Sequence, residues 1–525
     1  MHPSARTPCP VADGNRKGWR MTQAVSAGYE ATRVRRPVPT LRHRFLRAAA
    51  RVSETVEVGA LPVTLLWERT RDALTARLGS RAEALLPPLG AWVFFVAFAG
   101  QGLRDLIGWG PFAVLTFLSA LVFAMVFVAA GRRVGVRRLP GPVIAYPLVC
   151  CLSFVWSAYR LETAAASLVM VLSTAIGVML AVAFPLRTML DALTRCLQWT
   201  LGISLGLEAF VAVVIGHRIP PLYMLGWEHV PDSYYWVNGL LLQGGPIQGF
   251  VGNRNPLAFI ALLALLCVVV THLDGRMSLA RTTLWVGLSV LTLGLTRSAT
   301  VTVAAVGCLA VLVVALVLRS LPPERRRSAL HIALGVALLL CLSALAMHTQ
   351  VSDLLGRDPD MTGRAEIWER VLRLWSLHPL TGWGWIMYWA PWLPMFRYLV
   401  VRPDGTPTMQ AHNAYVEALF QTGLIGAVVL VVAVVWVTRN VLRTALRDLD
   451  SDITSLLPAL LMTAMLIQSF TESRLLSEGN WVLFVALGTW LTVRADTAEV
   501  HLPAFRARTV GTQVSPLEVP ATTGR

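Results

Sequence analysis

Twelve apolar runs, most of them long enough to cross a lipid bilayer, follow one another along this chain of 525 residues. A transmembrane helix needs roughly 20 mainly apolar residues. Charged residues make up only 14% of the chain, whereas about a quarter is usual in a soluble domain. The sequence therefore predicts an all-α polytopic membrane protein with about 12 transmembrane helices. The runs lie at about 86–103, 108–130, 139–157, 163–186, 196–216, 256–273, 282–295, 299–318, 329–347, 414–438, 453–470 and 480–493.

Arginines gather in alternate connections between these runs. The five connections expected inside carry four, two, two, four and three arginines, and the four short outer ones carry one each. This asymmetry follows the positive-inside rule and predicts that both termini are cytoplasmic. Nearly all basic residues are arginine, which is typical of a high-GC bacterium, so we expect a multi-pass protein of the bacterial cytoplasmic (inner) membrane. The loops and tail account for the net charge of +16, which indicates membrane lipids rather than nucleic acid as partners.

The runs divide the chain into parts that we expect to differ in function. Long loops carry function more often than core helices do, so we expect the active site on the outer face of the membrane. The expected parts are a basic, partly disordered cytoplasmic tail (1–84), nine transmembrane helices with an outer loop at 217–255 (85–347), a large extracytoplasmic loop with short helices (348–413), three transmembrane helices (414–493) and a second cytoplasmic tail (494–525).

The large outer loop ends in a histidine that leads directly into an apolar helix. The sequence AHNAYVEALFQTGLIG places His412 and Asn413 nine residues before Gly423-x-x-Gly426. The ordinary pKa of imidazole lies near 6.5, so a histidine at the water edge of a bilayer is a candidate general base. A structural histidine at the membrane interface is the other interpretation.

An amphipathic helix is predicted in the same loop, over the sequence TGRAEIWERVLRLW. Thr362 or Gly363 can cap its start, and Arg364 falls on the face that Trp368 and Val371 otherwise make apolar. A guanidinium beside the free amides of a helix N-terminus suits a phosphate group. An arginine that is solvated or paired with a carboxylate is the alternative.

Two further arginines lie at the predicted outer boundary. Arg297 separates two apolar runs with almost no connection around it, and a guanidinium there must snorkel, pair or meet a ligand. Arg254 lies in GNRNPLA, where the outer loop re-enters the bilayer. Proline is favoured at the first position of a helix, so Pro256 predicts that Asn255 is an N-cap.

Several common signatures are missing from the sequence. No Walker-type phosphate loop, Rossmann fingerprint or GxSxG elbow occurs at a suitable place, and no Cys/His cluster has metal-ligand spacing. Chemistry driven by ATP or by nucleotide sugars is therefore disfavoured. We expect no metal and no cofactor, and a donor that is already activated when it reaches the site.

Residues from about 250 to 440 resemble the O-antigen ligase/O-antigen polymerase family of bacterial membrane glycosyltransferases. The resemblance rests on GNRNPLA, on the arginine of TRSAT, on TGRAEIWERVLRLWSLHPLTGWGW and on the His-Asn-x9-Gly-x-x-Gly pattern. It implies a helical membrane fold of the GT-C type and a metal-independent, inverting transfer from a polyprenyl-diphosphate-linked glycan. By the same resemblance, Arg297 and Arg364 match arginines that hold the diphosphate, and His412 matches the histidine that activates the acceptor. Residues expected to support them are Arg254, Asn255, Asn413, Tyr415 and Glu417.

The leading interpretation is a glycan ligase that moves a preassembled glycan from a polyprenyl diphosphate to an acceptor hydroxyl on the outer face. The first alternative is a polymerase that extends a lipid-linked repeat unit. A transporter or flippase of lipid-linked sugars is a further alternative, and it predicts paired ionisable residues near the bilayer midplane. Glu208 is a weak candidate for such a residue. The sequence leaves the glycan, the acceptor and the oligomeric state open.

Overall fold

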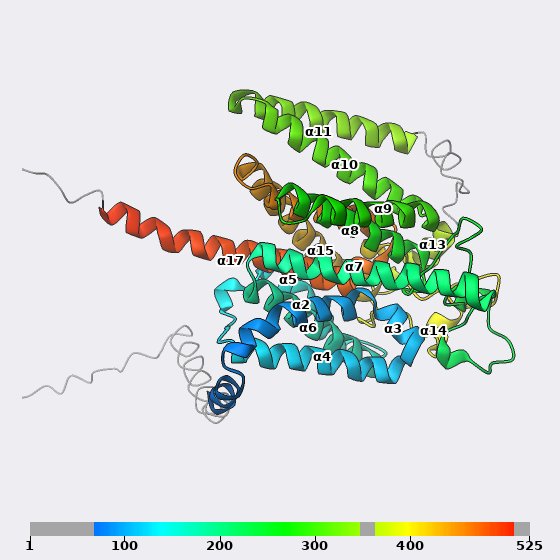
Figure 1. Cartoon of the computed structure of the whole chain (residues 1–525). Helices are drawn as coiled ribbons and strands as arrows, with labels where there is room; N and C mark the ends of the chain where they lie inside the picture. The colour runs from blue at the N-terminus through cyan, green and yellow to red at the C-terminus, as the bar shows by residue number, and fades with distance from the viewer. Residues whose placement is uncertain (1–67, 347–362, 509–525) are drawn as a thin grey trace, which may run out of the picture. The chain divides into compact units, whose positions relative to one another are not determined.

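The computed structural model describes residues 68–346 and 363–508, and these residues are mostly helical (Figure 1). Within the described ranges no strand forms, and only two isolated bridges pair extended residues. The helices are α2 (Ser80–Phe98), α3 (Gly100–Ile107), α4 (Trp109–Ala129), α5 (Gly141–Leu152), α6 (Arg160–Ala183), α7 (Leu186–Phe210), α8 (Arg254–Leu273), α9 (Leu279–Thr296), α10 (Ala299–Ser320), α11 (Pro323–Ala346), α13 (Arg364–Trp375), α14 (Pro394–Arg397), α15 (Ala414–Arg447), α16 (Leu456–Ser469) and α17 (Glu478–Arg508).

Every predicted apolar run overlaps one of these helices, which confirms an all-α membrane protein. In the described part of the chain, 8 helices are long and apolar enough to cross a membrane. Two shorter apolar helices, at Gly141–Val155 and Ile453–Ser469, accompany them. The count of twelve spans and the GT-C type stay predictions.

The helix α8 is the most enclosed of the span-length helices. Its apolar stretch is 72% buried, compared with 22% for α9 and 28% for α10. It packs against α7, α9 and α16, and Figure 1 shows it running beside α9. Exposed apolar residues on α10, such as Val306 and Leu309, suit contact with lipid tails. The GNRNPLA sequence therefore begins a helix at the centre of the protein.

Connections that the sequence predicts on the same side of the membrane contact one another. On the predicted inner side, Arg187 pairs with both Asp274 and Asp452 at 3.0 Å. On the predicted outer side, the backbone N–H of Ser233 donates to Asp404 at 3.0 Å, which joins the 217–255 loop to the large loop. This grouping agrees with the predicted topology. The side that faces the cytoplasm stays a prediction.

Glu208 anchors the 217–255 loop to α7. Its Oε1 accepts the backbone N–H of both Gln248 and Gly249 at 2.8 Å. Nearby, Ser204 accepts the N–H of Phe250 at 3.1 Å. Because buried amides need such partners, the loop can fold back into the helical core here. This structural use of Glu208 weakens the only sequence feature that favoured transport.

Gly423 interrupts α15 with φ 67 and ψ −170. The backbone of the large loop enters the break, where Pro379 and Leu380 accept the N–H groups of Leu424 and Ile425 at 2.9 and 3.2 Å. A Cβ atom on Gly423 would collide with the carbonyl oxygen of Leu380. Glycine is required at this position because the left-handed backbone and the close approach both exclude a side chain.

We therefore expect Gly423→Ala to lower the thermal unfolding temperature of the purified protein. A positive φ combined with ψ near 180° is open essentially to glycine alone and costs a residue with a Cβ about 1–3 kcal/mol, and the contact with Leu380 adds to this. Gly287→Ala is the matched control, because Gly287 lies in α9 and a Cβ added there would meet nothing within 4 Å. A Gly423→Ala protein with the same thermal unfolding temperature as the wild type would contradict this account.

Candidate functional site

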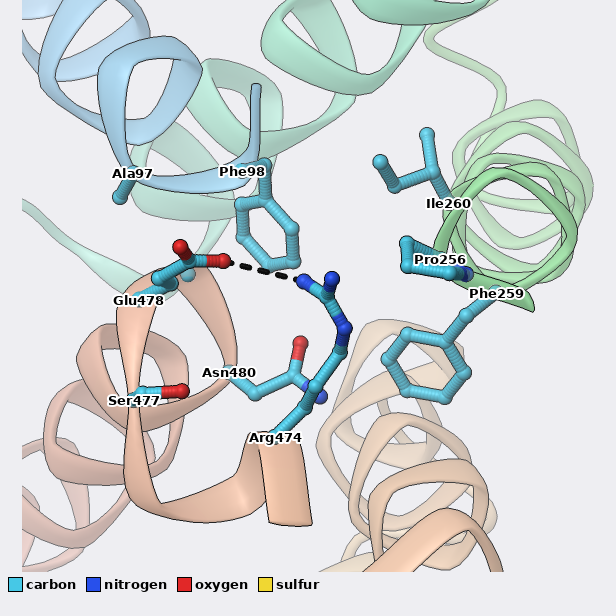
Figure 2. A pocket seen from close by; sticks show the side chains of 10 residues that line it. Ala97, Phe98, Pro256, Phe259, Ile260, Arg474, Ser477, Glu478 and Asn480 are labelled. Carbon is cyan, nitrogen blue, oxygen red and sulfur yellow. Dashed lines mark hydrogen bonds and ion pairs between the residues drawn. The ribbon is translucent and has the colours of Figure 1, made fainter. Parts of the chain in front are cut away.

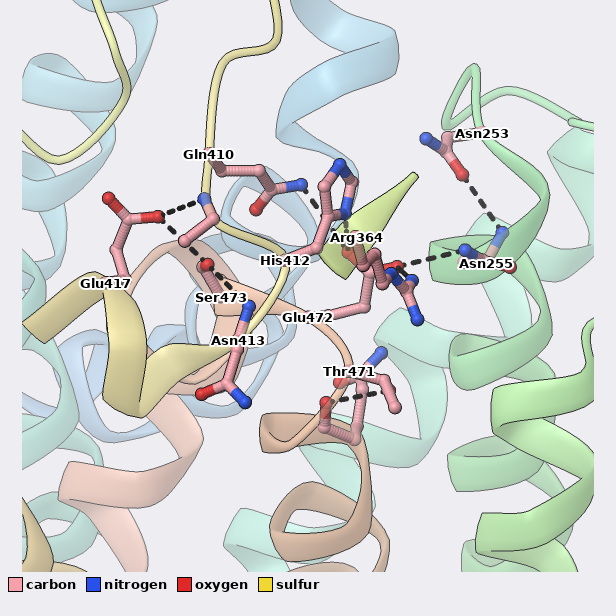
Figure 3. A network of polar contacts seen from close by, with 12 residues as sticks. Asn253, Asn255, Arg364, Gln410, His412, Asn413, Glu417, Thr471, Glu472 and Ser473 are labelled. Carbon is pink, nitrogen blue, oxygen red and sulfur yellow. Dashed lines mark hydrogen bonds and ion pairs between the residues drawn. The ribbon is translucent and has the colours of Figure 1, made fainter. Parts of the chain in front are cut away.

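The helix α15 begins at a turn that separates His412 from the helix. Asn413 is the N-cap, and its side-chain oxygen accepts the N–H groups of Tyr415 and Val416 at 2.9 and 3.1 Å. These are amides that a helix otherwise leaves unsatisfied. His412 has φ 53, a conformation uncommon for residues other than glycine and enriched at functional sites. Figure 3 shows the imidazole of His412 pointing away from the Asn413 side chain.

Glu472, in the connection that follows α16, receives contacts from four side chains (Figure 3). Its Oε1 accepts from Arg364 at 3.2 Å and from Asn255 at 3.0 Å. Its Oε2 lies 3.1 Å from Nδ1 of His412 and 3.4 Å from the amide nitrogen of Gln410. Only 4% of the Glu472 side chain is exposed, compared with 22% for His412. One buried carboxylate thus joins α8, α13 and the turn before α15.

The environment of Glu472 favours its ionised form. Burial acts to raise the pKa of a carboxyl. The opposing effects are the charge and hydrogen bond of His412 and the charges of Arg364 and Arg474, and together they lower the pKa of Glu472 to about 2. An ionised carboxylate can only accept hydrogen bonds, so its partners must donate to it.

The start of α8 differs from the prediction. Asn253, not Asn255, is the N-cap, and its side chain accepts the N–H of Asn255 at 3.0 Å. Pro256 is accordingly the third helical residue rather than the first. The earlier cap leaves the Asn255 side chain free to donate to Glu472 and to accept from the Ser298 hydroxyl at 2.9 Å. The predicted capping role was therefore wrong, because it was assigned from proline alone.

The two boundary arginines lie beside this network without contacting Glu472. Arg297 has φ 48, and its guanidinium donates to the carbonyl of Gly244 at 2.9 Å. The next residue, Ser298, contacts Asn255. Arg254 is exposed, and no described residue forms a hydrogen bond or ion pair with its side chain. Both guanidiniums keep N–H groups available to a ligand.

Glu417, in the first turn of α15, holds the turn before this helix through hydrogen bonds. Its carboxylate accepts from Trp389 and from the backbone N–H of Ala411, both at 2.6 Å, and from the Ser473 hydroxyl at 3.1 Å. Gln421 donates to it as well, at 2.6 Å. Four donors thus satisfy a carboxylate that is 1% exposed, and they fix the residue that precedes His412.

Tyr415 does not join the polar network. Its hydroxyl accepts from Ser469 at 3.1 Å, and its ring centroid lies 5.1 Å from that of Phe470. It therefore supports the contact between α15 and the end of α16.

A second charged cluster adjoins the first. Glu478 accepts from Arg104 at 2.7 Å and from Arg474 at 3.0 Å. Figure 2 shows Arg474 reaching across a small cavity toward Glu478, and Arg474 is also one of the cations that act on Glu472. The cavity is lined by apolar residues of α2 and α8 and by polar residues near the start of α17: Ala97, Phe98, Pro256, Phe259, Ile260, Arg474, Ser477, Glu478, Gly479 and Asn480.

The structure thus brings Asn255, Arg364 and His412 onto one carboxylate that the sequence reasoning missed. Glu472 lies in TESR, between two apolar runs on the predicted outer side, two residues before the arginine of that connection. An acidic residue in a short connection facing a candidate histidine was the available signal. Its position beside His412 depends on packing between segments 60 residues apart in the chain.

Part of the chain is similar to known proteins. Residues 282–431 match the family model described as O-antigen ligase. A relative, the exopolysaccharide production protein ExoQ of Rhizobium meliloti (strain 1021), is 25% identical over 170 residues. That alignment covers 30% of this chain and 39% of the relative. The family match contains Arg297, Arg364 and His412 and ends before Glu472.

We expect Glu417→Ala to loosen the segment before His412. Each buried donor left without a partner costs about 1–3 kcal/mol, so residues near Trp389 and Ala411 should become sensitive to protease in the purified protein. Glu369→Ala is the matched control, because Glu369 is exposed and pairs with exposed Arg373 in the same loop. Equal cleavage of both variants and the wild type would show that Glu417 does not hold this segment.

Proposed function

We propose, from the O-antigen ligase-family sequence that residues 282–431 carry, that this membrane protein is a glycosyltransferase acting as a glycan ligase. It moves a preassembled glycan from a polyprenyl diphosphate to an acceptor hydroxyl on the outer face of the cytoplasmic membrane. The observation that carries the proposal is the convergence of His412 and Arg364 on Glu472, with Arg297 one residue from the same network.

His412 acts as the general base in this proposal. Its ring takes the proton of the acceptor hydroxyl while the acceptor oxygen bonds to the anomeric carbon of the glycan. The bond between that carbon and the diphosphate oxygen breaks in the same displacement, so the configuration at the carbon inverts. The 22% exposure of the His412 side chain leaves part of the ring accessible to an acceptor.

Arg297 and Arg364 bind the diphosphate and stabilise it as it leaves. Guanidinium groups form strong paired hydrogen bonds to phosphate oxygens, and fixed cations offset the charge that develops on a leaving group. Arg297 is exposed and uses one nitrogen on Gly244, which leaves further N–H groups for phosphate. We therefore propose that the transfer proceeds without a divalent metal ion.

A polymerase that extends a lipid-linked repeat unit is the second candidate. It is favoured by the similarity to a protein named for exopolysaccharide production. Both reactions use the same donor chemistry at the anomeric carbon, and they differ in the acceptor. A ligase forms a product on a chemically distinct acceptor, whereas a polymerase lengthens the lipid-linked chain itself.

We expect His412→Ala to lower the rate of glycan transfer about 100–10,000-fold, the usual contribution of a general base. The assay uses purified protein, a polyprenyl-diphosphate glycan and candidate acceptors, with the products separated by mass. Arg373→Ala is the control, because Arg373 is exposed and pairs with Glu369 at 2.7 Å. Transfer at the wild-type rate by His412→Ala would eliminate His412 as the base.

The same assay tests the role of the arginines in place of a metal. We expect transfer to continue at an unchanged rate in excess chelator, because Arg297 and Arg364 supply the positive charge. Arg297→Ala should raise the donor KM and lower kcat under the same conditions. Activity lost in chelator and restored by added magnesium or manganese would refute the metal-independent mechanism.

A further inference from the structure

The imidazole of His412 has two ring nitrogens, and its contact with Glu472 determines which of them can accept a proton. Nδ1 of His412 lies 3.1 Å from Oε2 of Glu472. A carboxylate accepts and cannot donate, so Nδ1 must carry the hydrogen in this contact. In a neutral imidazole the lone pair is then on Nε2, which becomes the nitrogen able to take a proton.

Neighbouring donors and cations hold the Glu472 carboxylate in place and keep it ionised. Its other oxygen is held by Arg364 and Asn255 at 3.2 and 3.0 Å. The charged groups around the pair are Arg364 from α13 and Arg474 from the turn after α16. Asn255, in the first turn of α8, and Gln410, just before His412, are neutral donors to the same carboxylate. A carboxylate in this position carries a full negative charge beside the imidazole.

We propose that Glu472 is a positioning residue for His412: it orients the ring, keeps the lone pair on Nε2 and stabilises the imidazolium formed during transfer. This inference rests on the proposed function. The proton moves from the acceptor hydroxyl to Nε2, Glu472 stays ionised throughout, and the proton leaves Nε2 after the diphosphate product departs. Arg364 then has two partners, the donor diphosphate and the carboxylate that serves the base.

The pairing can be measured without any transfer assay. Diethylpyrocarbonate modifies only unprotonated imidazole, so the modification of His412 in the full-length purified protein, followed by peptide mass spectrometry across pH, reports its protonation. We expect Glu472→Gln to lower the pH midpoint of His412 modification, because the variant loses the opposite charge that lies beside the imidazole. His378, exposed and stacked edge-on against Trp383, is the internal reference and should keep its midpoint.

A second variant guards against misfolding. Glu472→Gln leaves the buried Arg364 without a counter-charge, and an isolated buried charge is destabilising. The double variant Glu472→Gln/Arg364→Gln removes both charges and should still show the lowered His412 midpoint. A midpoint that stays at the wild-type value in both proteins overturns the proposal.

Transfer kinetics separate this inference from the proposed function. We expect Glu472→Gln to lower kcat about 100-fold with a smaller change in acceptor KM, and Glu472→Asp, which keeps the charge, to recover part of the rate. The control is Glu369→Gln, which changes an exposed carboxylate paired with Arg373 and should transfer glycan at the wild-type rate. Transfer that requires His412 but is unaffected by Glu472→Gln refutes the positioning role alone. If the wild-type protein transfers no glycan but Glu472→Gln still shifts the midpoint, the proposed function is refuted and the pairing is supported.

Discussion

The candidate site depends on the contacts that surrounding segments make with the buried carboxylate of Glu472. Removing a carboxylate from water is costly unless cations and hydrogen-bond donors replace the lost hydration. Here those donors come from the start of α8, the start of α13 and the turn before α15. The same requirement that keeps the charge stable therefore brings three distant segments together. The large loop that carries α13 is held against the helical core by this charge in addition to apolar packing.

Local patterns in the sequence predicted the elements of the site well. The helical period placed Arg364 on the face it shares with Val371, and the structure buries both. Gly363, one of the two residues expected to cap α13, is the N-cap. The glycines after His412 formed only a spacing in the sequence, and the structure explains Gly423 by its backbone angle. These features depend on a few consecutive residues, so one sequence is sufficient to predict them.

The contacts between elements could not be predicted in the same way. Glu472 meets His412 only because α16 packs against α15, and no spacing in the chain encodes that contact. The capping error at α8 has a related cause, since a proline is accepted at more than one position in the first turn of a helix. The family match also ends at residue 431, so a comparison restricted to that region omits the carboxylate that organises the site.

The break at Gly423 has a mechanical consequence. The loop backbone fills the gap left in the helix, because Trp383 and Gly384 donate to the carbonyls of Phe420 and Gln421 at 3.1 and 2.9 Å. The base of the loop is therefore hydrogen-bonded into the break in α15. It cannot move as a rigid flap unless these hydrogen bonds to the helix are broken. Any movement of the large loop that opened a path to His412 would therefore involve segments held through side chains rather than the base of the loop.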